Sequence, residues 1–418
     1  MSSRGKLWGC QIFREENLPK GWEFASLESR IDFEYGAPLA EEIRMPGSIP
    51  VYGSNGVVGM HNQALVSGPG IVVGRKGTIG AVSYVPTDFW PIDTTFWIHR
   101  KRGDEVRYLE ALLDFFQLGR LNAATGVPGL SRRDALALNA FIPTPDEQAA
   151  IARILDAADT AIERARTAVE KARRVKKSLV QALFAKGLRR HAFHKTPLGS
   201  LPTDWNVVPV GEVLTEAQYG LSMPMLAKGD YPILRMAAIQ NGQVLLSDFK
   251  YVNLSKPSAD QYLLRRGDVL FNRTNSFEHV GKVGIFRSER PAVFASYLIR
   301  LQTKPESIDN FYLGHLLSSY AVQCRIRRYA TPGVQQVNIN ASNLKRVLIP
   351  VPAEKKGMDE QRDIARMLEQ EETVIAAAED RVAALERLKR GLMQDLLTGR
   401  VRVKTALPPL AAAAPSPA

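Results

Sequence analysis

The chain has 418 residues, of which 45% are hydrophobic and 23% are charged, a composition typical of a soluble globular protein of about two to three domains. Its net charge of +12 favours an acidic partner such as nucleic acid. Two cysteines without a CxxC spacing exclude a thiolate zinc site and a disulfide framework, and no apolar run reaches the roughly 18 residues of a membrane span. The six histidines form no metal-binding spacing, so we expect a cytoplasmic protein without a metal site.

Residues 1–17 form an N-terminal segment, and residues 18–145 form the first predicted domain. Short β-type runs at 70–74 and 80–85 are separated by glycine turns, and a helical stretch follows at 105–118. This order predicts an α+β domain and not the alternating series of a Rossmann-type fold.

Polar and basic side chains of the first domain gather in two glycine turns, at 51–56 and 74–80. Such groups reach the phosphates and base edges of DNA, where Arg matches guanine and Asn matches adenine with paired hydrogen bonds. The candidate DNA-binding residues here are Ser54, Asn55, Arg75, Lys76 and Thr78. A β-turn that needs glycine for its backbone and carries solvated charge has the same composition, so both interpretations stay open on local sequence alone.

Residues 146–190 are predicted to form one long helix. Its apolar positions recur at alternating spacings of about four and three residues, which is the seam of a coiled coil, and Lys176 interrupts them. Acidic residues in the first turn and a glycine at the end suit such a helix. The seam residues that we select are Ile151, Leu155, Ile162, Val169, Leu179 and Leu183.

The second predicted domain, residues 191–353, has β-type runs at 268–271 and 283–286 and a helical stretch at 309–328. Its main polar turn, at 272–282, does not match the turns of the first domain. The candidate DNA-binding residues here are Arg235, Asn272, Arg273, Thr274, Asn275, His279 and Lys282. Replacing Arg273 by Ala is expected to weaken DNA binding.

A second long helix is predicted at 354–403, followed by an Ala- and Pro-rich tail at 404–418 that is predicted to be disordered. The heptad spacing of the first helix recurs in the second. Its seam residues are Ile364, Leu368, Ile375, Val382, Leu392 and Leu396.

Three motifs occur twice in the same order along the chain. Leu-Pro-x-x-Trp begins at Leu18 and Leu201, Pro-x-Pro at Pro143 and Pro350, and Glu-Gln-x-x-Ile at Glu147 and Glu360. Two copies are too few for a solenoid. The chain is therefore predicted to be a duplicated unit, a mixed domain followed by a long helix.

The charges of the two helices favour antiparallel pairing. Residues 146–170 carry a net charge of −3 and residues 171–190 one of +8, whereas 358–380 carry −6 and 381–402 carry +4. Antiparallel packing places unlike halves together, and parallel packing places like charges together. The same charges also suit the dipole of each helix by itself.

Antiparallel pairing also predicts a contact between two charges that interrupt the seams. With the centre of the pair at residue 167, Lys176 lies opposite Glu371, so the two charges would neutralise each other. The alternative is that Lys176 extends its charged end into water.

The chain lacks the motifs of a catalyst. It has no Walker A loop, no glycine-rich cofactor loop after a strand, no Asn/Asp-Pro-Pro-Tyr-type segment and no nucleophile elbow. The glycines at 74–80 lie between two predicted strands and do not open a helix, which excludes them as a cofactor loop. We therefore expect no enzymatic activity in this chain.

The duplicated order of motifs over residues 18–403 resembles the specificity subunit of Type I restriction–modification systems. The resemblance implies an α+β fold with two pseudo-twofold-related target recognition domains, joined by two long antiparallel coiled-coil helices. The recognition domains would be 18–145 and 191–353, each reading one half of a bipartite double-stranded DNA target, and the helices at 146–190 and 354–403 would set the spacing.

The resemblance further implies a role in phage defence with partner subunits. These are two modification (methyltransferase) subunits, docked on the helices and domains, and restriction (endonuclease and translocase) subunits. S-adenosylmethionine, ATP and magnesium would belong to the partners, with no cofactor in this chain. Alternatives are a modifying enzyme, a coiled-coil scaffold with protein-binding domains, or the specificity subunit of a methylation-only or Type II-like system.

Overall fold

The computed structural model describes residues 13–121, 128–188, 192–246, 249–332 and 336–404. The first 12 residues of the predicted N-terminal segment and residues 405–418 of the predicted tail lie outside the described residues. The chain forms two compact units, unit 1 with Met1–Thr167 and Glu379–Ala418, and unit 2 with Ala168–Ala378.

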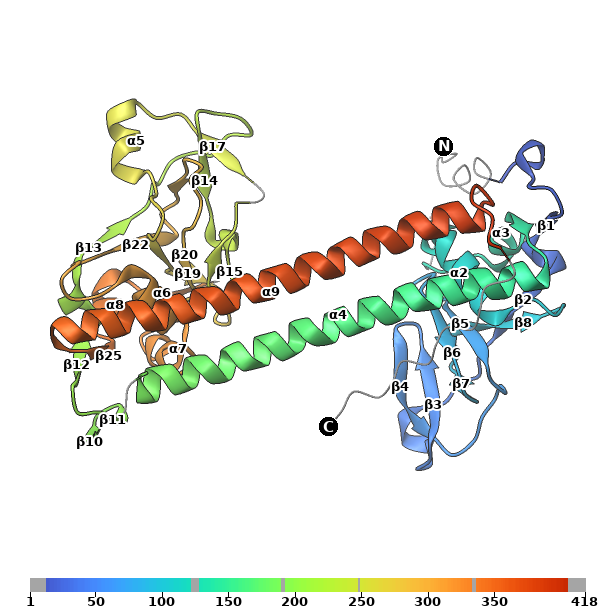
Figure 1. Ribbon diagram of the computed structural model, residues 1–418, viewed down its shortest axis with the longest axis horizontal. Coiled ribbons are helices and arrows are strands. Elements are labelled where there is room, and N and C mark those ends of the chain that lie inside the picture. Colours follow the sequence, from blue (N-terminus) through green and yellow to red (C-terminus); the bar gives the residue numbers. More distant parts are fainter. Residues whose placement is uncertain (1–12, 122–127, 189–191, 247–248, 333–335, 405–418) are drawn as a thin grey trace. The chain divides into compact units, whose positions relative to one another are not determined.

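Unit 1 contains the first mixed domain (Figure 1). Its elements are β1 (Glu23–Ser26), β2 (Ile31–Tyr35), β3 (Ile49–Gly53), β4 (Gly56–His61), β5 (Gly70–Gly74), β6 (Val82–Val85), β7 (Trp90–Pro91), β8 (Thr95–Arg100), α2 (Val106–Phe115), the 3-10 helix η4 (Leu118–Leu121), α3 (Arg132–Leu136) and β9 (Asn139–Ile142). Helix α4 (Pro145–Lys186) follows, and α9 (Glu354–Leu397) ends in this unit.

The strands of unit 1 form a four-stranded sheet in the order β2-β8-β5-β6, a three-stranded sheet in the order β4-β3-β7, and the ladder β1-β9. In β2 the side chains of Ile31 and Phe33 are buried and alternate with the half-buried Asp32, as expected for a strand with one face on the core. Helix α2 buries Leu109, Leu112 and other apolar residues on one face against the same core.

Unit 2 contains the second mixed domain. Its elements are β10 (Phe193–Thr196), β11 (Gly199–Pro202), β12 (Trp205–Pro209), β13 (Leu214–Tyr219), β14 (Tyr231–Leu234), β15 (Ile239–Gln240), β16 (Gln243–Val244), β17 (Lys250–Val252), α5 (Lys256–Tyr262), β18 (Val269–Asn272), β19 (Thr274–Asn275), β20 (Val283–Ile285), β21 (Val293–Phe294), β22 (Leu298–Thr303), α6 (Asn310–Ser318), α7 (Tyr320–Arg327), β23 (Thr331–Pro332), β24 (Val337–Asn338), α8 (Ala341–Lys345) and β25 (Leu348–Pro352).

The two domains have the same strand order. The run β13-β22-β18-β20 of unit 2 corresponds to β2-β8-β5-β6, β17-β14-β21 corresponds to β4-β3-β7, and β12-β25 corresponds to β1-β9. Unit 2 adds β16-β15 to its main sheet and the small sheet β19-β24-β23. The predicted duplicated α+β domain is therefore confirmed.

One predicted helix is interrupted. The stretch predicted as helical at 309–328 forms two helices, α6 and α7, because Ser319 between them has an extended backbone (φ −65°, ψ 145°). The side chain of Ser319 donates to the carbonyl oxygen of Leu316 at 2.6 Å, and this bond satisfies a carbonyl at the end of α6.

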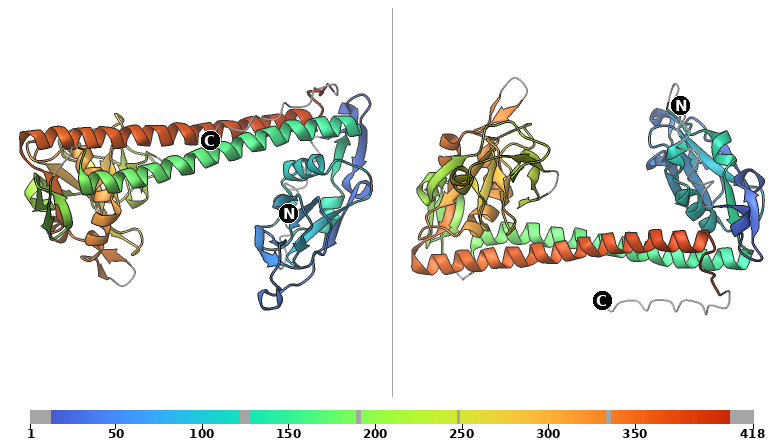
Figure 2. Two further views of the ribbon diagram at one scale, coloured as in Figure 1. Left: turned by 60° about the horizontal axis from the view of Figure 1, so that its bottom comes forward. Right: turned by 90° about the horizontal axis from the view of Figure 1, so that it is seen from above.

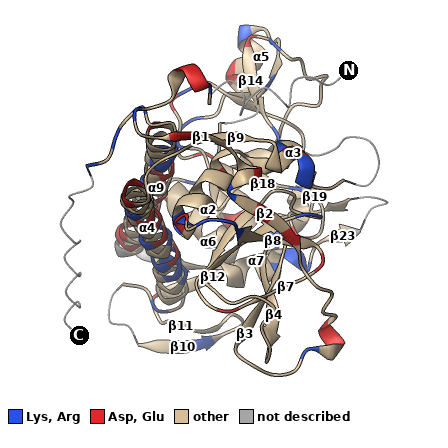
Figure 3. Cartoon of the chain, turned by 90° about the vertical axis from the view of Figure 1, so that its right-hand side faces the viewer, with Lys and Arg blue, Asp and Glu red and all other residues tan. Residues whose placement is uncertain are grey.

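The long helices pack antiparallel within each unit, as predicted. In unit 1 Asp159 pairs with Lys389 at 2.6 Å and Arg166 with Glu386 at 2.7 Å, so residue numbers fall on one helix as they rise on the other. In unit 2 Lys176 pairs with Glu372 at 2.6 Å. In Figure 3 both basic and acidic positions are coloured along the ribbons of α4 and α9.

The predicted seam residues lie on the packed sides of the helices. Those that the structure buries are Ile151, Leu155, Ile162, Val169, Leu183, Ile364, Leu368 and Leu396, and those that it half-buries are Leu179, Ile375, Val382 and Leu392. Several of them also join the core of the mixed domain in their own unit, as Ile151 does in unit 1 and Leu368 in unit 2. In each unit the strands lie to one side of the helix pair (Figure 2).

The predicted partner of Lys176 was wrong by one residue. Lys176 pairs with Glu372, whose side chain is 6% exposed, and not with the half-buried Glu371. The equivalent pair in unit 1 is Lys389 with Asp159, since Asp159 stands at the same distance from Glu147 as Glu372 does from Glu360. The antiparallel register places these acids beside the interrupting lysines.

The Glu-Gln motif joins each domain to its helix, and in unit 1 the Trp of the Leu-Pro-x-x-Trp motif also bonds to it. In unit 1 the indole Nε1 of Trp22 donates to Glu147 Oε2 at 2.8 Å, and Arg402 donates to the same carboxylate at 2.7 and 2.9 Å. Gln148 donates to the carbonyl oxygen of Pro143 and accepts from the backbone N–H of Glu105.

Gln361 makes the same two kinds of bond in unit 2, to the Pro352 carbonyl and from the Asp309 N–H. The motifs are therefore structural. No helix in the described part of the chain is long and apolar enough to cross a membrane.

Candidate nucleic-acid interface

In unit 1 the two candidate turns meet at the backbone of Thr94. The hydroxyl of Ser54 donates to the Thr94 carbonyl oxygen at 2.8 Å, and the N–H groups of Arg75 and Lys76 donate to the same oxygen at 3.0 and 3.1 Å. The structure thus brings all five predicted residues of this domain into adjoining turns. Of these, Asn55, Lys76 and Thr78 are exposed, while Ser54 and Arg75 are half-buried.

Glycine holds this pair of turns in place. Gly80 has a φ of +75°, and a Cβ at this position would collide with the backbone of Gly119 in η4. The turn therefore packs tightly on η4 while its tip at 76–78 stays exposed. The glycines of these turns are therefore structural, and the polar side chains at the tip are exposed, while DNA contact by them stays a prediction.

In unit 2 four predicted residues line one pocket of about 770 Å³. They are Arg235, Asn275, His279 and Lys282, and they come from two separate stretches of the domain, the segment after β14 and the polar turn at 272–282. Gln240, Asn241 and Tyr297 add further hydrogen-bonding groups, and Met225 and Met236 add apolar surface. Sequence analysis missed these five because they lie outside the polar turn and the fold alone brings them to it.

The remaining three predicted residues of unit 2 lie deeper. Asn272 is fully buried, and neither atom of its side-chain amide has a hydrogen-bond partner among the described residues. This places Asn272 behind the turn and not on a surface that could touch DNA, which corrects its selection as a contact. Arg273 and Thr274 are half-buried, and Thr274 pairs with Asn338 in the sheet β19-β24.

In each unit a cluster of charged side chains attaches the mixed domain to the long helices. The sequence did not reveal these clusters. In unit 1 Arg107 of α2 contacts Asp156 (Nε to Oδ1, 2.5 Å) and Asp159 (3.7 Å) on α4. Lys389 of α9 completes it through Asp159. We call this set, together with Glu110, the unit 1 lock.

The unit 2 lock has the same plan with a different arginine. Arg287, just after β20, contacts Glu369 at 2.5 Å and Glu372 at 2.7 Å on α9, and Lys176 of α4 also contacts Glu372. Glu369 and Glu372 are the equivalents of Asp156 and Asp159. Acids repeated at the same place beside both seams were the one sequence signal that could have revealed the locks.

The locks shift the pKa of two carboxyl groups in opposite directions. Burial raises the pKa of Glu369, but hydrogen bonds from Arg287 and His315 outweigh it and lower that pKa to about 2. In unit 1, burial raises the pKa of Glu110 to about 7, against the opposing effects of Arg107 and Lys389.

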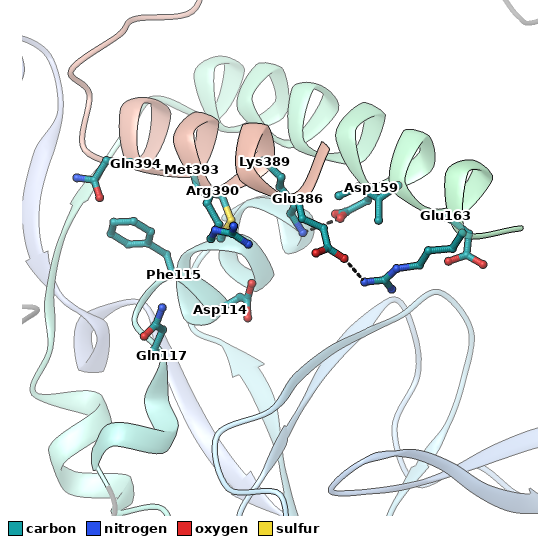
Figure 4. A pocket seen from close by; sticks show the side chains of 12 residues that line it. Asp114, Phe115, Gln117, Asp159, Glu163, Glu386, Lys389, Arg390, Met393 and Gln394 are labelled. Atoms are coloured by element: carbon teal, nitrogen blue, oxygen red, sulfur yellow. Dashed lines mark hydrogen bonds and ion pairs between the residues drawn. The ribbon is translucent and has the colours of Figure 1, made fainter. Parts of the chain in front are cut away.

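A pocket adjoins each lock. In unit 1 it has a volume of about 650 Å³ and lies between the end of α2 and the two long helices, with Asp114, Asp159 and Lys389 among its lining residues (Figure 4). In unit 2 a pocket of about 310 Å³ lies at the equivalent place, lined by residues that include Lys176, Glu372 and Ser318 at the end of α6. The two pockets therefore share a plan but differ in size and charge.

His315, Glu369 and Glu372 bring possible metal-ligating atoms within 4.8 Å of one another. Both carboxylates already face Arg287, and Glu372 also faces Lys176, so protein cations balance their charge. We therefore interpret this group as part of the unit 2 lock and not as a metal site.

Two copies of one α+β domain, each fastened to a pair of antiparallel helices by a charged lock, define the class of protein. The family model described as "Type I restriction modification DNA specificity domain" matches residues 19–171 and 202–387. The chain belongs to this family.

Curated relatives agree with the family. The chain is 30% identical over 209 residues to the putative Type I restriction enzyme MjaX specificity subunit of Methanocaldococcus jannaschii, covering 49% of this chain and 48% of that protein. It is 27% identical over 289 residues to the MjaVIII specificity subunit of the same organism, covering 67% of this chain and 66% of that protein. The chain thus spans between about half and two thirds of these relatives' lengths.

Solved structures share the fold. The S subunit of a Type I restriction–modification system from M. genitalium superposes with a TM-score of 0.60 at 14% identity, covering 92% of this chain and 98% of that one. A chain from a structure describing complex assembly and conformational transition of the Type I system superposes with a TM-score of 0.53 at 17% identity, covering 92% and 99%.

Proposed function

We propose that this chain is a specificity subunit that recognises DNA sequence for a Type I restriction–modification complex, with each domain binding one half of a bipartite target. The observation that carries the proposal is the duplication itself. Two domains with the same strand order carry different polar turns, as expected when one scaffold presents different residues to different bases. The family and the net charge of +12 support it.

The candidate contacts are the exposed turn of unit 1 and the pocket of unit 2. Asn55, Lys76 and Thr78 in the first domain, and Arg235, Asn275, His279 and Lys282 in the second, offer the groups that hydrogen-bond to base edges and phosphates. The methionines beside the second set offer apolar contact of the kind that suits a thymine methyl group.

In this proposal the chain is a non-catalytic subunit that acts in the cytoplasm. Methylation and cleavage, with their S-adenosylmethionine, ATP and magnesium, belong to the modification and restriction subunits. The two pockets beside the locks suit a partner that binds twice, since they recur at equivalent places in the two units. We propose them as docking points for two modification subunits.

The test is to express the chain with its modification subunit in a host that lacks DNA methylation and to sequence the methylated bases. We expect one bipartite motif with a constant gap, and no methylation when this chain is omitted. Methylation or cleavage by the purified chain alone would contradict a non-catalytic role. Binding to DNA that is independent of both sequence and salt would favour a scaffold instead.

A further inference from the structure

Arg75 of unit 1 is held by a set of contacts to its side chain and backbone, which we call its bracket. Its guanidinium carbon lies 5.2 Å from the centre of the Tyr35 ring, at the end of β2, and Nε and Nη2 donate to the carbonyl oxygen of Asp93 at 3.2 and 2.6 Å. The backbone N–H of Arg75 donates to Thr94, and its carbonyl accepts from the N–H of Leu130. These contacts fix both the backbone and the plane of the guanidinium.

The same bracket recurs in unit 2 around Arg273. Its guanidinium carbon lies 5.0 Å from the ring of Tyr219, at the end of β13, and Nη1 donates to the carbonyl oxygen of Ser296 at 3.4 Å. The N–H of Arg273 donates to Tyr297, and its carbonyl accepts from Ile339. The ring, the carbonyl and both backbone partners come from elements equivalent to those around Arg75.

Neither arginine is neutralised. Within the described part of the chain, their side-chain contacts are carbonyl oxygens and aromatic rings, and neither forms an ion pair. By contrast, Arg107 faces three carboxylates and Arg287 faces two. A guanidinium has five N–H groups. Two of those of Arg75 and one of those of Arg273 donate to carbonyl oxygens, and Nε of Arg273 is buried without a partner among the described residues. Three N–H groups of each arginine are therefore left for another acceptor.

The contacts around Arg75 and Arg273 are alike, but the turns that follow the two arginines differ. Lys76 to Gly80 follow Arg75 in the first domain, whereas a longer and unrelated turn from Thr274 to Lys282 follows Arg273 in the second. Two half-sites of different sequence have only one feature in common, the phosphodiester backbone. A group that both domains keep unchanged suits that shared feature, and the divergent neighbours suit the bases.

We infer that Arg75 and Arg273 are matched phosphate contacts that anchor each domain on DNA without reading its sequence. This inference rests on the proposed function and assigns a role within it. Stacking on tyrosine holds the guanidinium in one orientation before DNA arrives, so less side-chain entropy is lost on binding. The residues that choose the bases are then the neighbours of the brackets.

The test uses the chain in complex with its modification subunits and two DNA duplexes. One duplex contains the recognition motif identified by sequencing the methylated bases, and the other contains that motif in scrambled order. Arg75→Met and Arg273→Met are each expected to weaken binding to both duplexes alike, by about tenfold. Each should reduce the slope of log K against log salt by about 0.9, the value for one phosphate contact. The methylated sequence should stay the same.

Arg290→Met is the matched control, because Arg290 also stacks on an aromatic ring, Phe249 at 4.7 Å, but lies outside the bracket and the pocket. It should leave the salt slope unchanged. Arg75→Lys and Arg273→Lys keep the charge, so they should restore most of the slope even where they lower the melting temperature. A purely structural arginine would not respond in this way.

Three results would overturn the inference: an unchanged salt slope in the Met variants, a loss confined to the motif duplex, or a changed methylation motif. The last two would mean that the arginines read bases. Failure of the proposed function itself looks different, since the unaltered complex would then fail to distinguish the two duplexes.

Discussion

Arg287→Met tests how strongly the lock of unit 2 holds the domain on its helices. Methionine keeps most of the length of the side chain but removes the charge that faces Glu369 and Glu372. Glu372 is nearly buried, and Lys176 would remain as its partner, while Glu369 would keep only His315. The variant therefore leaves the buried Glu372 with Lys176 and the half-buried Glu369 with His315 as its one remaining charged or ionisable partner among the described residues.

The size of the effect follows from the pKa of Glu369. Its fall from 4.5 to about 2, at about 1.4 kcal/mol per unit, means that its surroundings favour the charged form by about 3 kcal/mol after the opposing effect of burial. His315 supplies part of this, so we assign about 2 kcal/mol to Arg287. That is below the roughly 3–5 kcal/mol for breaking a fully buried pair, as suits a Glu369 side chain that is 27% exposed.

Hydrogen exchange followed by mass spectrometry measures the loss in the right place, because it reports the opening free energy of α6 and of the first half of α9 separately from unit 1. We expect both segments to open more easily by about 2 kcal/mol. Arg366→Met is the control, since Arg366 pairs with Asp363 in solvent and should change stability by less than about 0.5 kcal/mol.

Equal effects of Arg287→Met and Arg366→Met would refute this reasoning. The double variant Arg287→Met/Glu369→Gln sharpens the test, because it also removes the carboxylate charge that Arg287 would otherwise face. It should lose less than the sum of the two single variants. Strict additivity would show that Arg287 and Glu369 do not depend on each other.

Acid should weaken the unit 2 lock. The pKa of Glu369 is lower in the folded protein than in the unfolded chain, so its contribution is fully present above about pH 4.5 and is lost as the pH falls toward 2. Opening of α6, followed from pH 5 to about pH 2, should therefore become easier in the unaltered protein. Glu369→Gln should show a flatter profile, and parallel profiles would contradict the assignment.

Three further predictions concern unit 1. The pKa of Glu110 is raised to about 7 in the folded state, so this carboxyl makes unit 1 less stable as the pH rises from about 4.5 to 7. Glu110→Gln should therefore remove that pH dependence of stability in thermal melts. An unchanged pH dependence would mean that another group causes it. Gly80→Ala should lower the free energy of unfolding in urea by more than about 1 kcal/mol, because Gly80 has a φ of +75° and an added Cβ would collide with Gly119. Gly77→Ala should lower it less, because Gly77 has a similar φ but open space around the added Cβ. Trp22→Phe should lower the free energy of unfolding by about 1–2 kcal/mol, because the hydrogen bond to Glu147 is lost. Trp205→Phe should lower it less, because the Nε1 of Trp205 has no partner among the described residues. The reverse order in urea unfolding would contradict the role of the Trp22 bond.

Local and periodic features of this protein were accessible from its sequence. Heptad spacing marks Ile151 and Leu368 as seam residues because a helix places every third or fourth side chain on one face, and net charge selects antiparallel pairing because it acts over whole helix halves. The recurrence of three motifs revealed the duplication, and with it the family. The exposed turn of unit 1 was also found, because glycines and polar residues adjoin there in the chain.

Only the tertiary structure decided which residues meet. Composition could not show that Asn272 lies behind its turn, or that Met225 and Tyr297 join one pocket, since strand pairing between distant segments determines both. The register of the helices, in which Lys176 pairs with Glu372, depends on packing at the level of single residues. The equivalence of Arg75 and Arg273 is invisible in dissimilar turns, because it lies in matching backbone partners and tyrosine rings that the fold brings to each arginine.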